Sequence, residues 1–174
     1  MRPTFSIAFC AVLIFSSFSA HSAPPEQVHP SYDVVISIKN LATKKEDYIL
    51  KAHVWQGHST KLTSEISQRP FVTGFTESKP KKAIIQIIES SAAAEVKLSE
   101  TDSGALAVDA TIEITDVTDV RPKQYSGTEE NVQTVRVGTT KTRLIETIAP
   151  NEKLNSTLSI GGKTYDATVS VVRN

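Results

Sequence analysis

Apolar and polar side chains alternate one by one through most of this chain, and this period of two limits the fold more than any other feature. Residues 32–38, 48–54 and 106–114 each place an apolar side chain at every second position. Successive side chains of a β-strand point to opposite faces of the sheet, so the pattern predicts strands with one buried and one wet face.

Glycine-containing turns divide these alternating segments. Asp102-Ser103-Gly104 comes directly before the segment 106–114, and Gly161-Gly162 lies between two further alternating segments. Glycine adopts positive φ angles at little cost, so both turns predict β-hairpins.

Two places near the carboxyl end are expected to interrupt the strands. We expect Gly138 to separate a strand over 132–137 from a second strand over 143–148. Residues 121–131 contain Pro122 and few apolar side chains, and we expect them to form the longest loop of the chain.

The segment from Ala83 to Leu98 is ambiguous between strand and helix. Its branched residues Ile84, Ile85, Ile87 and Ile88 favour a strand, whereas the following run of alanines favours a helix. We favour a strand for this segment.

The chain shows no linker that would divide it. Residues 32–174 are therefore expected to form a single domain of eight to ten short strands. The fold class is all-β, with at most one short helix, as an antiparallel β-sandwich or a partly open barrel.

The first 23 residues have the pattern of a removable export signal. Arg2 precedes a short apolar run, and small residues follow at Ala20-His21-Ser22-Ala23. We expect residues 1–23 to be a signal peptide, residues 24–31 to be an extended tail, and the protein to be periplasmic or secreted.

Charge and cysteine content exclude several function classes. The only cysteine is Cys10, inside the signal, so disulfides and thiolate chemistry are excluded from the remainder. Removing Arg2 with the signal leaves 18 of the 19 basic residues against 19 acidic ones, so no net field attracts nucleic acid. Lys79, Lys81 and Lys82 form a basic cluster that we interpret as a solubilising loop or strand end.

Motifs for catalysis or cofactor binding are incomplete. The sequence Gly161-Gly162-Lys163-Thr164 resembles the end of a phosphate-binding loop, but Thr157 occupies the position of the required glycine. Asp116 and Asp119 are interpreted as solvated charges at a strand end. We therefore expect no enzyme, no cofactor and no metal.

Three residues around one turn are candidates for contact with a partner or ligand: His53, Trp55 and His58. The two histidines flank the turn and would need a third ligand to hold a metal, so we favour ordinary strand or surface histidines. Trp55 is expected to pack at the end of the sandwich, with an exposed binding anchor as the alternative.

Three segments resemble the β domains of secretins, the outer-membrane rings of type II and III secretion and type IV pilus systems. The first is Ala52 to Ser59 with the following Pro70-Phe71-Val72, the second is Gly104 to Ile112, and the third is Gln133 to Val137. The resemblance implies a small, free-standing, secretin-like protein of a Gram-negative periplasm, without implying a channel.

The sequence thus predicts a non-enzymatic exported protein that contacts another envelope protein, with edge-strand pairing as one mode of contact. Two alternatives stay open. One is a small-ligand or carbohydrate carrier that stacks its ligand on Trp55, Tyr48 or Phe71, and the other is a hydrolase that uses His53 and His58.

Overall fold

The computed structural model describes residues 30–124, 131–149 and 151–174, and this part of the chain is all strand and turn, with no helix. The all-β expectation is confirmed. The nine strands are β1 (Ser31–Asn40), β2 (Glu46–Trp55), β3 (Ser59–Thr63), β4 (Ser67–Phe75), β5 (Ala83–Glu100), β6 (Leu106–Gln124), β7 (Asn131–Ile148), β8 (Lys153–Ile160) and β9 (Lys163–Arg173).

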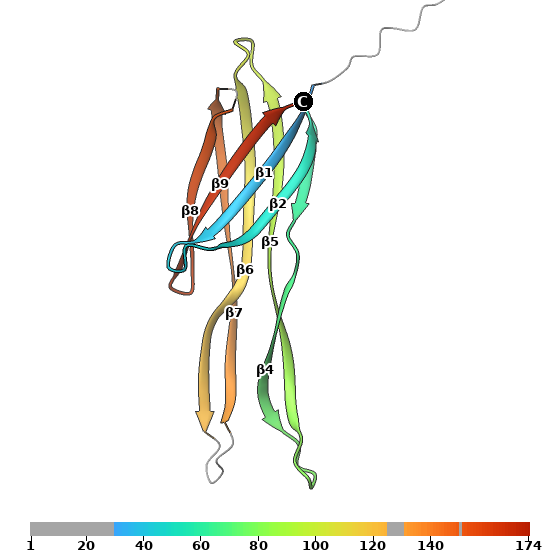
Figure 1. Ribbon diagram of the computed structural model, residues 1–174, viewed down its shortest axis with the longest axis vertical. Helices are drawn as coiled ribbons and strands as arrows, with labels where there is room; N and C mark the ends of the chain where they lie inside the picture. The colour runs from blue at the N-terminus through green and yellow to red at the C-terminus, as the bar shows by residue number, and fades with distance from the viewer. Residues whose placement is uncertain (1–29, 125–130, 150) are drawn as a thin grey trace, which may run out of the picture.

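The strands form two antiparallel sheets (Figure 1). Sheet A has the order β2-β1-β9-β8, and sheet B has the order β3-β5-β6-β7, with β4 pairing with β5 beyond the end of β3. Within the described residues neither sheet closes on itself, so the fold is not a closed barrel and is consistent with the expected β-sandwich.

The main core lies between sheet A and the upper part of sheet B. Every second residue of the facing strands points into it, as the alternating sequence requires. Its largest fully buried side chains are Val34, Ile36, Ile38, Leu50, Val54, Val96, Leu98, Val108, Ile112, Ile114, Tyr165 and Val169.

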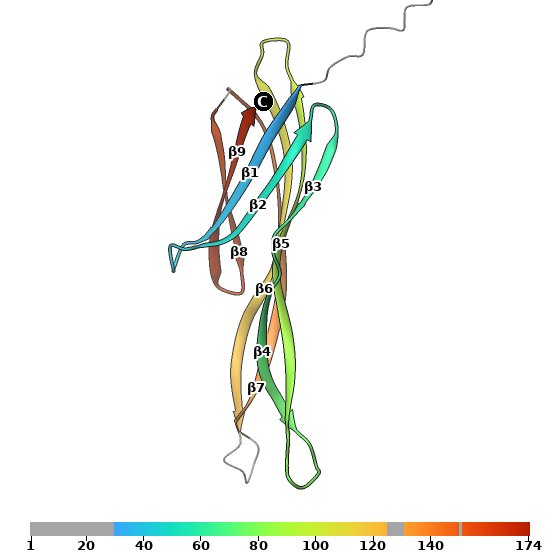
Figure 2. The same cartoon turned by 45° about the vertical axis from the view of Figure 1, so that its right-hand side comes forward.

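The lower part of sheet B extends well beyond sheet A (Figures 1 and 2). β5 is hydrogen bonded to β6 only as far as the pair Ser91 and Thr115, and below this pair the two strands diverge. One ribbon then consists of β4 with residues 83–90 of β5, and the other of residues 117–124 of β6 with residues 131–137 of β7. We call these two ribbons the arm.

The segment 83–98, ambiguous in sequence, lies within the single strand β5. Its central residues Ala93 and Ala94 pair with β3 on one side and with β6 on the other. Two neighbouring strands satisfy the backbone hydrogen bonds there, and this pairing overrides the helix propensity of alanine.

Two expected interruptions are wrong. β6 continues as a strand to Gln124, through the residues 121–124 that were expected to be loop, while residues 125–130 lie outside the described residues. Pro122 is accommodated because β6 pairs only with β7 there, which leaves one edge without a ladder. Gly138 does not divide two strands either, because it pairs with Asp116 inside an unbroken β7.

Both expected glycine turns are confirmed. The turn containing Gly104 joins β5 to β6, and Gly161 and Gly162 join β8 to β9 with φ angles of 54° and 78°.

The predicted signal, residues 1–23, and residues 24–29 of the predicted tail lie outside the described residues. Ser31, the last residue assigned to the tail, already belongs to β1. Within the described ranges there is no helix of the length and apolar character needed to span a membrane.

Candidate interaction surface

The ribbon formed by β4 and β5 presents one continuous apolar face. Directly opposite residues of an antiparallel pair share a face, and the pairs here are Pro70 with Ile87, Val72 with Ile85, and Phe75 with Ala83. A bulge between Val72 and Gly74 keeps Phe75 on the same face as Val72. We call these six residues the apolar strip.

The apolar strip is open to solvent at its centre. Ile85 and Ile87 are each 60% exposed, although a strand residue of this kind is normally buried. On the opposite face of the β4–β5 ribbon, Ile88 is only 8% exposed, whereas Ile84, nearer the tip of the arm, is 47% exposed. Ile88 lies outside the main core, in the arm, where β4 contacts β7.

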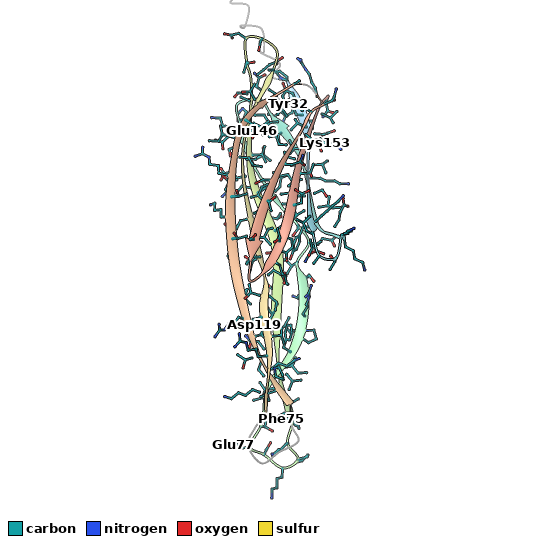
Figure 3. The ribbon with its side chains drawn as sticks, turned by 90° about the vertical axis from the view of Figure 1, so that its left-hand side faces the viewer. Tyr32, Phe75, Glu77, Asp119, Glu146 and Lys153 are labelled. Carbon is teal, nitrogen blue, oxygen red and sulfur yellow. The ribbon has the colours of Figure 1, made fainter. Side chains whose placement is uncertain are left out.

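Charges of opposite sign lie at the two ends of the apolar strip. At its upper end, Glu89 accepts a 3.0 Å hydrogen bond from the amide of Gln68 on the same face. Lys79, Lys81 and Lys82 lie at its lower end, in the connection between β4 and β5, as expected for a basic strand end. Figure 3 shows Phe75 and Glu77 at this lower end and Tyr32 at the opposite end of the molecule.

A buried carboxylate joins the arm to the sandwich. Asp116 of β6 is 3% exposed and lies immediately below the last β5–β6 pair. One carboxylate oxygen accepts bonds from the hydroxyl of Ser90 (2.9 Å) and the amide of Val117 (2.7 Å). The other oxygen accepts bonds from Lys163 Nζ and the hydroxyl of Tyr165, both at 2.6 Å. β5 and β6 of sheet B are thereby tied to β9 of sheet A.

The surroundings of this carboxylate decide its charge state. Burial alone would raise the pKa of Asp116, but the four donated hydrogen bonds outweigh burial and lower it below the ordinary carboxyl value. Burial, together with the negative charge of Asp116, raises the pKa of Tyr165 and raises that of Tyr48 to about 12. The site therefore holds one carboxylate anion among neutral tyrosines and one lysine.

The interpretation of Asp116 as a solvated strand-end charge is wrong. Its neighbour Asp119 does lie at the surface of the arm and forms a 2.6 Å ion pair with Arg121. Asp116 differs because β9 lies across the point where β5 and β6 separate, and this tertiary arrangement has no local sequence signal.

A close backbone contact strengthens the same junction. Thr118 is the extra residue of a bulge in β6, and it packs against Gly161 in the β8–β9 turn. A Cβ atom at Gly161 would lie 2.2 Å from Cβ of Thr118, whereas one at Gly162 would meet nothing within 4 Å. Only glycine allows this approach between the two sheets.

The three residues proposed from sequence lie at the other end of the molecule, on β2 and in the turn that follows it. His53 Nδ1 lies 3.0 Å from a carboxylate oxygen of Asp33 and 3.2 Å from the amide nitrogen of Asn174. The His53 and Trp55 rings meet edge to face at 5.3 Å. Trp55 keeps 49% of its surface exposed, so it is only in part packed against the sandwich. The amide of His58 bonds to the carbonyl of Trp55 and closes the turn.

The described residues include no group of three or more His, Cys, Asp or Glu side chains that could hold a metal ion. A pocket of about 170 Å³ lies between Tyr32, Glu100 and Arg173, and it is smaller than the 300–1,000 Å³ usual for ligand sites. A larger hollow of about 710 Å³ is open, and Arg143 and Asp109 in its lining already bind one another through two hydrogen bonds.

Sequence reasoning did not select the apolar strip, although a signal was present. A strand with apolar residues at consecutive positions, such as Ile84-Ile85 and Ile87-Ile88, is typical of strands covered on both faces. In this structure one of those faces has no cover.

No known protein family, curated protein or solved structure matches this chain. The segments that resemble secretin β domains lie at the β2–β3 turn, in β4, from the β5–β6 turn into β6, and in β7.

Proposed function

We propose that this chain is an exported, non-enzymatic protein of the cell envelope that contacts another protein through its arm. The observation that carries this proposal is the apolar strip. Burying a fully exposed isoleucine side chain contributes about 1.5–3 kcal/mol of free energy. Ile85 and Ile87 are each 60% exposed, so a partner that covers both would gain a large part of this free energy from each of them. Exposed apolar patches of this kind commonly mark interaction sites.

Unpaired strand edges add a second means of contact. Within the described residues, 83–90 of β5 pair with β4 alone and 117–124 of β6 pair with β7 alone. Free backbone groups along such edges can pair with a strand of another chain. The resemblance of three segments to secretin β domains favours a partner from a secretion or pilus assembly.

The proposal is tested by cross-linking and affinity capture from envelope extracts of the producing cell. Ile85→Lys/Ile87→Lys should lose the captured partner, because each lysine would need to be dehydrated at the contact. Ile145→Lys is the matched control, since Ile145 is 65% exposed on the outer face of sheet B, opposite Asp109. Equal capture by the wild type and both variants would refute the role of the arm.

A further inference from the structure

We infer that the apolar strip binds the same strip of a second copy of this chain, with the two ribbons face to face and running in opposite directions. This inference rests on the proposed function, since it takes the apolar strip as the contact surface, and it places a second copy of this chain there instead of a secretion or pilus protein.

The strip is flat, short and narrow. From Ala83 to Glu89 a strand rises by about 20 Å, and two paired strands are about 10 Å wide. A flat apolar face of this kind fits another flat apolar face, and β-ribbons pack face to face at a spacing of about 10 Å. An identical strip supplies such a face without requiring a further component.

The charges at the two ends select the orientation. Glu89 stands at the upper end of the strip. The connection at the lower end carries three lysines, Lys79, Lys81 and Lys82, against one acidic residue, Glu77, so the strip has an acidic end and an end of net positive charge. When two copies meet in opposite directions, Glu89 of each copy lies near the lysines of the other. A parallel arrangement would bring like charges together at both ends. The antiparallel arrangement has two-fold symmetry, which is the commonest symmetry of protein dimers.

The size of the strip sets the strength of the contact. Its area is well below the roughly 800 Å² per partner of a stable interface, so the dimer should be weak and form only at high protein concentration. Salt should weaken it further, because its end charges remain exposed.

Sedimentation of the purified chain over a concentration series up to about 0.5 mM tests this directly. We expect a monomer–dimer equilibrium that Ile85→Lys/Ile87→Lys weakens by about a hundredfold or more and that Ile145→Lys leaves within about threefold of wild type. A chain that stays monomeric throughout, or a dimer that the double variant leaves intact, would overturn the inference.

Charge exchange tests the orientation with variants that leave the apolar residues in place. Glu89→Lys alone and Lys79→Glu/Lys82→Glu alone should each weaken the dimer by about tenfold, and the triple variant should recover most of this loss. Failure of the triple variant to recover would overturn the antiparallel arrangement.

The capture experiment separates the two proposals. If the chain is monomeric but the isoleucine variant still loses a captured envelope protein, the arm binds a different partner and only the self-association is wrong. If Ile85→Lys/Ile87→Lys changes neither the sedimentation nor the captured proteins, both proposals are wrong.

Discussion

Replacing Asp116 with asparagine tests the junction between arm and sandwich most directly. Asparagine has nearly the shape of aspartate, but it offers one acceptor oxygen and carries an amide that is itself a donor. The amide would face two of the four donors that now bind the carboxylate, and it leaves the Lys163 ammonium without its counter-charge.

The magnitude follows from these losses. A hydrogen bond to a charged group contributes about 1.5–3 kcal/mol, and removing one partner of a buried ion pair typically costs about 3–5 kcal/mol. Lys163 keeps about a third of its side chain exposed (33%), so water compensates part of the loss of charge. We therefore expect Asp116→Asn to lower the free energy of unfolding by about 3–4 kcal/mol, a large share of the 5–15 kcal/mol usual for a domain.

The assay is urea unfolding followed by circular dichroism, with the free energy obtained by linear extrapolation. Asp109→Asn is the matched control, because Asp109 binds Arg143 through two hydrogen bonds at an exposed position. Exposed pairs contribute about 1 kcal/mol or less. The reasoning is refuted if the two variants lose the same stability. Adding Lys163→Met to Asp116→Asn should restore part of the loss, since it removes the stranded charge.

Three further predictions concern the same junction. Because folding lowers the pKa of Asp116, its carboxylate contributes fully to the free energy of unfolding above the unfolded carboxyl pKa, and this contribution disappears as the pH falls through the folded pKa. The urea midpoint should therefore fall less steeply from neutral to acid pH in Asp116→Asn than in wild type. Gly161→Ala should cost about 2 kcal/mol more than Gly162→Ala, because only the first clashes with Thr118, and equal melting temperatures would contradict the contact. Tyr165→Phe should lose about 1.5–3 kcal/mol in the same urea assay by removing one donor to the carboxylate, and a neutral result would mean that this bond contributes nothing.

The fold was largely predictable because its signal is local. Alternation at Leu106, Val108, Ala110, Ile112 and Ile114 specifies both a strand and its buried face, and all five side chains are buried in the structure. The errors at residues 121–124 and at Gly138 have one cause. Proline and glycine commonly break strands, but here the free edge of β6 tolerates Pro122. Gly138 is required inside β7 because a Cβ atom there would crowd Thr118 in the bulge of β6.

The candidate surface was less predictable because the exposure of the apolar strip depends on the tertiary packing around it. The apolar run around Ile85 is visible in the sequence, but the sequence does not show whether both of its faces are covered. Val96 and Leu98 of β5 point into the core with sheet A, whereas Ile85 and Ile87 lie on the other face of the strand and stay 60% exposed. Likewise, Asp116 looks like any other acidic residue until β9 brings Lys163 and Tyr165 to it. Trp55, His53 and His58 were candidate contact residues because of their residue type alone.

The unbroken course of β5, β6 and β7 gives the molecule a fixed reach. Each of these strands passes from the sandwich into the arm without a loop, and the 18 residues of β5 extend over about 60 Å. These continuous strands therefore set the distance between the β4–β5 end of the arm and the far end of the sandwich.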